Sequence, residues 1–475
     1  METFDLAEKT YCIINFGSIP PPHSLQPNRR PCVEGSVLML IAAISVLGLT
    51  VSLSLSRPII GRIRMEPAKA AVLGALITVG AGLLPVPDLI RTIEFLSLPV
   101  LTIVSLMTIT LIAEKAGFFQ LLARQIAKAA NGNGVKLFTY LFFSGTLAGT
   151  FFTNDAAVLI FTPMVYHLIE EVADNSWSAD NKIPYYFAVL YIANLVGAFI
   201  ISNPINIIVS GWFGIGFAEY AVWMLVPAVV SMIVTYHGMR FFFRGSIPAR
   251  CRKQPQSVII TARPAFLVGG GLVLLFTLLG FFSEGLTKMP AGYVAAAGAV
   301  AITLLYLKLE RGSLLKITRG IGWDAIIFVV GIFIVVSGLR AAGFTDIIGS
   351  LIMKSMAPGE HVASFTTSFI AGSCSAFMNN HPVAGIMAMT VRDLGLVHPT
   401  TRILALSSLI GGDLGPKMLP IGSLAALMWF RILRNKGVEI SYWQYIKLGV
   451  PITLAAILLS ALTLNLEYAL YLWMQ

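Results

Sequence analysis

The sequence is poor in charge and in cysteine, and these shortages exclude several classes of protein. Only 12% of its 475 residues are charged, and the four cysteines Cys12, Cys32, Cys251 and Cys374 are too scattered for a disulfide framework or a metal cluster. Cys12 and Cys32 share a polar N-terminal segment, and whether they pair stays open. Residues 1–34 have no basic start followed by an apolar core, so they do not resemble a cleavable signal peptide. No alternating ten-residue pattern indicates a transmembrane barrel.

Apolar residues are what the chain has in abundance. Hydrophobic residues make up 56% of the sequence, and the mean hydropathy is +0.81. Apolar runs near the roughly 20 residues that cross a bilayer recur from residue 35 to the C-terminus. We therefore predict an all-α polytopic membrane protein. Its ten expected spans are 35–56, 70–88, 96–113, 184–213, 218–239, 264–283, 290–307, 321–338, 401–430 and 446–472.

The net charge of +10 is informative about membrane topology and does not indicate nucleic-acid binding, because the basic clusters lie between apolar spans. With an external N-terminus, the loops on the cytoplasmic side hold 23 Lys and Arg residues and the external segments hold nine. Positive residues accumulate on the cytoplasmic side of membrane proteins. The count predicts a cytoplasmic 240–263 loop and external termini.

An internal repeat relates the two halves of the chain at a constant offset. The segment AGFFQLLARQIAKAANGNGVKLFTYLFFSGTLAGTFFTND from Ala116 corresponds, without a gap, to AGFTDIIGSLIMKSMAPGEHVASFTTSFIAGSCSAFMNNH from Ala342. Each half holds five spans and one further apolar segment with a polar centre, and an odd number of spans turns the second half upside down. Inverted repeats with a site at their interface are typical of secondary transporters. The predicted units are a polar segment 1–34, a first repeat 35–239 with a hairpin at 136–172, a basic linker 240–263, and a second repeat 264–475 with a hairpin at 361–397.

Four polar interruptions lie at membrane depth, two in each half. They are TND (153–155), SNPINI (202–207), NNHP (379–382) and GGDLGPKMLP (411–420). Such breaks are tolerated only where they are buried in protein or line a watery cavity. We interpret TND and NNH as the tips of two re-entrant hairpins, and the other two as unwound centres of broken spans, rather than as ordinary proline kinks. Half-helix N-termini and free carbonyls at these breaks would form a polar cage.

The residues of these breaks are the candidate site. Amide, hydroxyl and imidazole groups are candidates for substrate binding: Thr153, Asn154, Ser202, Asn203, Asn206, Asn379, Asn380 and His381. The charged groups are candidates for proton coupling, since a carboxylate at this depth costs roughly 2.5–3.5 kcal/mol and usually has a function there: Asp155, Asp413 and Lys417. We expect Asp155 to titrate most readily, because no basic residue is near it in the sequence.

Several roles stay open at this stage. Lys417 follows Asp413 by four residues, so the two could form a purely structural salt bridge. His381 is either a group that titrates near neutral pH or a hydrogen-bonding partner. Asp155 is alternatively a polar group buried for packing. Cys374 is expected to pack in the core.

Three blocks of the sequence resemble bacterial arsenite efflux permeases of the ArsB type. GGDLGPKMLPIGSLAALMWFRILRNKGVEISYWQYIKLG (411–449) is similar to the corresponding segment of that family, and NDAAVLIFTPMV (154–165) and FMNNHP (377–382) are similar to its two hairpin motifs. The similarity runs through most of residues 35–472. The family usually has methionine after the paired asparagines, where this chain has His381.

The resemblance implies export of arsenite and antimonite, as neutral trihydroxides, from the cytoplasm in exchange for protons, with no cofactor or metal. In some members a cytosolic arsenite-stimulated ATPase docks on the permease. The alternative within the wider superfamily is a sodium/proton antiporter or a dicarboxylate transporter, although TND and NNH lack the paired Ser-Asn-Thr motifs of the latter. An intramembrane aspartyl protease needs Gly-x-Gly-Asp, and residues 410–413 are IGGD. A channel fits four symmetric breaks less well than alternating access does.

Overall fold

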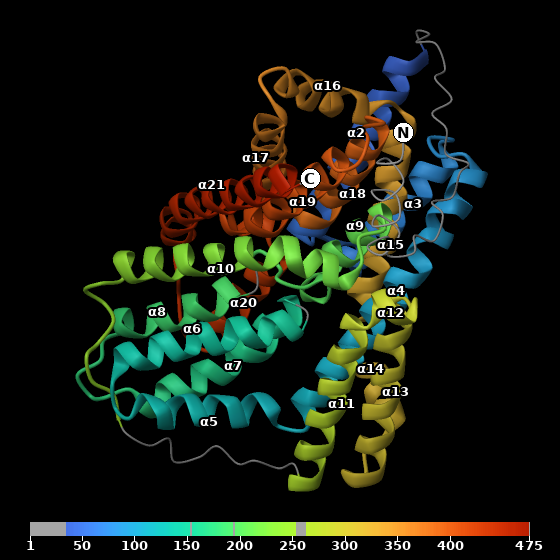
Figure 1. The fold of residues 1–475 in the computed structure, drawn as a ribbon. Helices are drawn as coiled ribbons and strands as arrows, with labels where there is room; N and C mark the ends of the chain where they lie inside the picture. Colours follow the sequence, from blue (N-terminus) through green and yellow to red (C-terminus); the bar gives the residue numbers. More distant parts are fainter. Residues whose placement is uncertain (1–34, 153, 193–194, 253–262, 475) are drawn as a thin grey trace, which may run out of the picture.

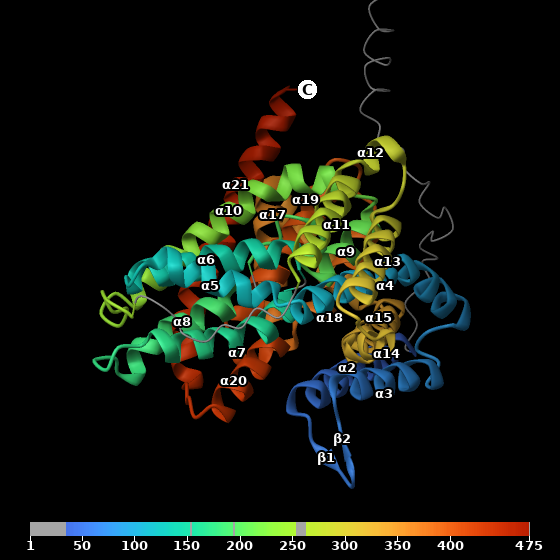
Figure 2. The ribbon, with the colours of Figure 1, turned by 90° about the horizontal axis from the view of Figure 1, so that it is seen from below.

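The chain folds as a bundle of helices with one short pair of strands (Figure 1). The structure is a computed structural model that describes residues 35–152, 154–192, 195–252 and 263–474. The elements of its first half are α2 (Gly35–Ser56), β1 (Ile59–Ile60), β2 (Ile63–Arg64), α3 (Pro67–Gly80), α4 (Val86–Lys115), α5 (Phe118–Ala130), α6 (Gly134–Phe151), α7 (Asn154–Val172), α8 (Ala179–Ile192), η1 (Ile200–Ser202), α9 (Pro204–Phe213) and α10 (Phe217–Phe242). The antiparallel pair β1 and β2 projects from the end of α2, as Figure 2 shows.

The second half repeats the order of the helices. Its elements are α11 (Pro264–Phe282), α12 (Glu284–Thr287), α13 (Ala291–Leu309), α14 (Leu314–Gly320), α15 (Trp323–Ala341), α16 (Phe344–Met356), α17 (Glu360–Met378), α18 (Asn380–Asp393), α19 (Thr400–Leu414), η2 (Gly415–Lys417), η3 (Pro420–Gly422), α20 (Leu424–Asn435) and α21 (Tyr442–Met474). The sequence offset that relates Ala116 to Ala342 also relates the helix starts: α5 corresponds to α16, α6 to α17, and α7 to α18. The repeat seen in the sequence therefore extends to the helix boundaries, and the inversion of the second half stays a prediction.

Seven helices of the described chain are long and apolar enough to cross a membrane. They coincide with seven of the ten expected spans: α2, α4, α10, α11, α13, α15 and α21. Two other expected spans are broken, as predicted, into α8 with α9 and α19 with α20. The expected span 70–88 was drawn too long. Its helix, α3, ends at Gly80, because Gly82 takes a left-handed φ of 69° and α4 then starts at Val86.

The two halves pack into each other rather than side by side. In the described residues α3 packs against α15, α10 against α21, and α7 against α20. The contact of α3 with α15 is close enough to need glycine, since a Cβ on Gly331 would lie 2.9 Å from the backbone of Ala71. Small residues at such positions let two helix backbones approach closely within a membrane. Each half is therefore completed by helices of the other.

The start of the basic linker is fixed to the first hairpin by backbone hydrogen bonds. The N–H of Cys251 donates to the carbonyl of Gly132 at 2.9 Å, and that of Arg252 to Val172 at 2.8 Å. The N–H of Gly134 donates in turn to the carbonyl of Ala249 at 3.2 Å. Residues 249–252 thus join both ends of the hairpin formed by α6 and α7.

Candidate functional site

Both broken spans meet at one carboxylate, that of Asp413 near the C-terminal end of α19. Asp413 is completely buried, and both of its oxygens accept hydrogen bonds from the segment that joins α8 to α9 and from the first turn of α9. The amide of Asn203 donates to Oδ1 at 2.7 Å. The backbone N–H of Gly197 and the amide of Asn206 donate to Oδ2 at 2.9 and 3.2 Å. The predicted breaks SNPIN and GDLGPK, which belong to different halves of the repeat, therefore form one polar cluster.

The local sequence explains why Asn203 faces Asp413. Pro204 occupies the first turn of α9, where its missing N–H is no loss, and Asn203 is the N-cap. The Oδ1 atom of Asn203 accepts from the N–H of Ile205 at 3.3 Å, which leaves its Nδ2 to donate to Asp413. Gly197 must lack a side chain, because a Cβ there would lie 2.3 Å from the amide nitrogen of Asn206.

Lys417 is buried next to this cluster without a hydrogen bond. Its side chain is 1% exposed, and in the described chain its Nζ has no hydrogen-bond partner. Nζ lies 5.1 Å from the ring centroid of Tyr191 on α8. The structural salt bridge with Asp413 does not form, since none of the ion pairs within 4.0 Å among the described residues includes Lys417. The α-helix ends at Leu414 and Lys417 lies in a 3-10 turn, so the two side chains are not one α-helical turn apart.

The second broken span unwinds later than its glycines suggested. Gly411 and Gly412 are still helical, and the α-helix gives way only at Gly415. Gly411 and Gly415 allow close packing against α17. A Cβ on Gly411 would lie 2.0 Å from the carbonyl oxygen of Ser368, and a Cβ on Gly415 would lie 2.2 Å from that of Gly372. The expectation that GDLGPK (412–417) is unwound was wrong for residues 412–414, which are still helical, because small residues at a helix contact were mistaken for helix breakers.

At the second hairpin tip, the side chains hold the turn together. Asn379 has a φ of 74° between α17 and α18, and its Oδ1 accepts both the backbone N–H of His381 at 3.2 Å and the ring Nδ1 at 2.8 Å. Because an amide oxygen can only accept hydrogen bonds, the contact of this oxygen with the imidazole ring places a proton on Nδ1 of His381. The ring also meets Phe328 edge-on at 5.6 Å. His381 is therefore a hydrogen-bonding partner of the tip, while Asn379, Asn380 and His381 are all buried.

The first hairpin tip is described only in part. Thr153 lies outside the described residues, as do the side chains of Asn154 and Asp155, although α7 begins at Asn154 as expected. Ser202 joins this hairpin to the first broken span, because its Oγ donates to the carbonyl of Thr150 at 3.2 Å. In the described part of the chain no hydrogen bond links the second tip to Asp413. The structure thus brings together Asn203, Asn206 and Asp413, with Lys417 beside them.

Sequence reasoning missed two members of this cluster, Gly197 and Tyr191. Gly197 contributes a backbone donor, which no side-chain pattern reveals. Tyr191 had a signal, because the offset of the repeat pairs it with Lys417. Cys374, on α17, is half-buried and packs against the core, as expected.

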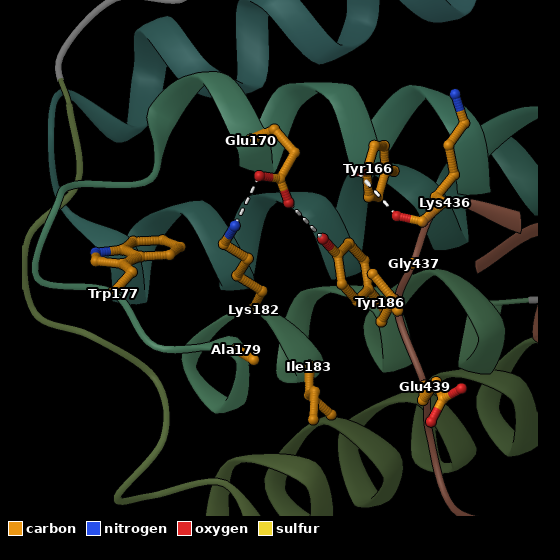
Figure 3. A pocket seen from close by; sticks show the side chains of 11 residues that line it. Tyr166, Glu170, Trp177, Ala179, Lys182, Ile183, Tyr186, Lys436, Gly437 and Glu439 are labelled. Atoms are coloured by element: carbon orange, nitrogen blue, oxygen red, sulfur yellow. Dashed lines mark hydrogen bonds and ion pairs between the residues drawn. The ribbon is translucent and has the colours of Figure 1, made fainter. Parts of the chain in front are cut away.

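An open pocket lies elsewhere, at the base of the first hairpin (Figure 3). Lys182 pairs with Glu170 at 2.7 Å, and the hydroxyl of Tyr186 donates to the other oxygen of Glu170 at 3.4 Å. The hydroxyl of Tyr166 donates to the carbonyl of Lys436 at 3.3 Å, which brings the loop between α20 and α21 onto this hairpin. Because the ion pair of Glu170 with Lys182 already satisfies its central charges, the pocket is a weaker candidate than the buried cluster at Asp413.

Comparison with known proteins identifies the family. A family profile described as "Arsenical pump membrane protein" (ArsB) matches residues 42–474. The chain is 32% identical over 376 residues to an arsenical pump membrane protein of Yersinia enterocolitica, covering 78% of this chain and 86% of the relative. It is 31% identical over 408 residues to one of Escherichia coli, covering 84% and 94%. The crystal structure of the Alcanivorax borkumensis YdaH transporter has the same fold, with a TM-score of 0.55 at 12% identity over 92% of this chain and 98% of that one. The resemblance seen in the sequence is confirmed, and the chain belongs to the arsenical pump membrane protein family.

Proposed function

We propose that this membrane transporter exports arsenite and antimonite from the cytoplasm in exchange for protons, by alternating access around the broken spans. The observation that carries the proposal is the buried contact of Asn203 and Asn206 with Asp413, which joins the two halves of the repeat. Substrate sites between repeats, built on discontinuous helices, are the arrangement that secondary transporters share. The two hairpin tips, with Asn154 and Asn380, complete the site from opposite sides of the membrane.

The chemistry of the site suits a neutral, hydroxyl-rich solute. Arsenite at neutral pH is mainly the uncharged trihydroxide, and hydrogen bonds from amides, hydroxyls and backbone can recognise it. Capture by thiolates would need up to three converging cysteines, and Cys374 alone lies near a break. The Oδ1 of Asn206 has no partner in the described chain and is an acceptor for such a hydroxyl.

Proton exchange gives a neutral solute access to the membrane potential. One charge moving through 100 mV contributes about 2.3 kcal/mol, which supports roughly a 50-fold gradient. The charged groups at the breaks, Asp155, Asp413 and Lys417, are the candidates for carrying that charge. A sodium site would need open carboxylate oxygens, and three N–H donors already occupy those of Asp413. This arrangement disfavours sodium binding at Asp413.

Uptake into everted vesicles tests the proposal. When the vesicle interior is acidic, arsenite should accumulate inside the vesicles. This accumulation should stop when a protonophore removes the pH gradient. An imposed sodium gradient without a pH gradient should drive no arsenite uptake. Sodium flux without arsenite flux would instead establish the sodium/proton antiporter.

The proposal includes the orientation and the partner. The 240–263 loop lies in the cytoplasm of a bacterial cell, with both termini outside the inner membrane. A cytosolic arsenite-stimulated ATPase, such as docks on some family members, would meet this cytoplasmic face. Coexpression with such an ATPase should raise arsenite resistance if the partner is used.

A further inference from the structure

We propose that Lys417 carries the exchanged proton, and that its uncharged amine accepts a hydrogen bond from a substrate hydroxyl. Proton and substrate would then compete for the same lone pair of electrons on Nζ. The inference rests on the proposed exchange of arsenite for protons and names the atom at which it happens. It differs from the sequence-based expectation that Asp155 titrates and that Asp413 and Lys417 form a structural pair.

Hydrogen bonds surround the carboxylate of Asp413. Its two oxygens accept three N–H donors, from Gly197, Asn203 and Asn206. Hydrogen bonds from N–H groups stabilise the charged form of a carboxyl group. A proton added to Asp413 would meet only donors on these partners and would displace at least one of them. Protonation of Asp413 would therefore cost hydrogen bonds that are present in the structure.

Lys417 is in the opposite situation. A protonated lysine has three N–H donors, yet its Nζ makes no hydrogen bond in the described chain, and it lies 5.1 Å from the centroid of the Tyr191 ring. A ring face attracts a cation far less than a set of hydrogen-bond acceptors does. Burying a charge without such partners is costly, whereas a neutral amine is buried at much lower cost. Of the two charged groups at the second break, Lys417 is the one whose proton the protein holds loosely.

Buried hydroxyl groups near Lys417 are of the kind that bind a hydroxyl-bearing ligand. The titratable groups facing it are Asp413 on α19, Tyr191 on α8, and Tyr445 on α21, whose hydroxyl donates to the carbonyl of Pro416 at 3.2 Å. α17 contributes Ser375, next to Gly415. The hydroxyls of Tyr191 and Ser375 have no partner in the described part of the chain. Buried polar atoms without a protein partner are available to water or to a polar ligand.

The exchange follows from the chemistry of one nitrogen atom. In the charged state Nζ has three protons and no lone pair, so it cannot accept a hydrogen bond from a hydroxyl of arsenite. Binding requires one proton to leave for solvent, after which the lone pair accepts the O–H of the trihydroxide. Returning the proton breaks that hydrogen bond and releases the solute. No covalent bond to arsenic forms, and each bound arsenite displaces one proton.

Binding and proton release can be measured together on purified protein in detergent. Arsenite is titrated calorimetrically in weak buffer with a pH indicator, from acid to neutral pH. Wild type should release up to one proton per bound arsenite, and its affinity should rise about tenfold per pH unit at the acid end. Lys417→Gln has an amide oxygen to accept the hydroxyl, so it should bind within about tenfold of wild type, release no proton and lose the pH dependence. Lys436→Gln, a substitution at the surface pocket, is the matched control and should behave like wild type.

The possible results separate this inference from the function on which it rests. Proton release by Lys417→Gln at the wild-type level overturns the role of Lys417, and loss of release in Asp155→Asn alone transfers that role to Asp155. Arsenite binding by wild type without proton release refutes proton exchange itself, and absence of arsenite binding refutes the substrate. If Lys417→Gln does not yield monodisperse protein, Lys417→Arg is used, because arginine stays charged. That variant should bind no arsenite at any pH, and binding with proton release would contradict the proposal.

Discussion

Replacing Asn203 with alanine should destabilise the protein through two separate losses. Asn203 caps α9 through its Oδ1, and removing such a cap costs about 0.5–2 kcal/mol. Its Nδ2 also donates to the buried Asp413 at 2.7 Å, and leaving a buried acceptor without its partner costs about 1–3 kcal/mol, more for a charged one. The two losses together predict a decrease of about 1.5–5 kcal/mol in the free energy of unfolding.

Asn133→Ala is the matched control for this experiment. Asn133 caps α6 by accepting the N–H of Lys136 at 2.9 Å, but it donates to no buried carboxylate. It should therefore lose only the cap, about 0.5–2 kcal/mol. Both variants are unfolded with increasing denaturing detergent in the same mixed micelles, and helical content is followed by circular dichroism. If Asn203→Ala is no less stable than Asn133→Ala, the bond to Asp413 does not contribute to stability as argued.

Three further predictions concern topology, the hairpin tips and packing. Cys251 should not react with an impermeant maleimide in intact cells but should react after permeabilisation. The reaction is run at alkaline pH, because burial raises the pKa of the Cys251 thiol. Labelling of Cys251 in intact cells would contradict the predicted orientation. Asn154→Ala and Asn380→Ala should each weaken arsenite export several-fold at normal expression, and full arsenite resistance with both variants would exclude the hairpin tips from the site. Gly415→Ala should strongly reduce the yield of folded protein, since its Cβ would lie 2.2 Å from a backbone oxygen, whereas Gly271→Ala has nothing within 4 Å and should be neutral or slightly stabilising. Equal yields of the two glycine variants would contradict the close packing of η2 on α17.

Sequence reasoning succeeded where a feature depends on local pattern. The breaks at Asn203 and at Asn379 were placed correctly, because proline and paired amides interrupt apolar runs at membrane depth and few other arrangements satisfy the backbone there. The helix boundaries also follow the repeat, so that α5 and α16 begin at Phe118 and Phe344. These features can be read from a single segment of the chain.

Features that depend on a partner segment could not be predicted in this way. The spacing of Asp413 and Lys417 suggested an ion pair, whereas the carboxylate is bonded to Gly197, Asn203 and Asn206 from the other half of the chain. Gly411 resembles a helix breaker in isolation, yet it is helical because the backbone of α17 lies against it. In both cases the deciding atom comes from a residue distant in sequence.

The packing of α3 on α15 has a consequence for biosynthesis. α3 has only 14 residues, and at about 1.5 Å per residue it is shorter than the hydrocarbon core of a bilayer. Its surface around Ala71 is covered by Gly331, which belongs to the second half of the chain and is synthesised much later. At the usual rate of roughly 5–20 residues per second, α3 would wait on the order of 10–50 s in the membrane before its partner emerges. During that interval the nascent chain exposes small residues to lipid or to the insertion machinery, so a ribosome that stalls before α15 leaves a product that cellular proteases can recognise as unfinished.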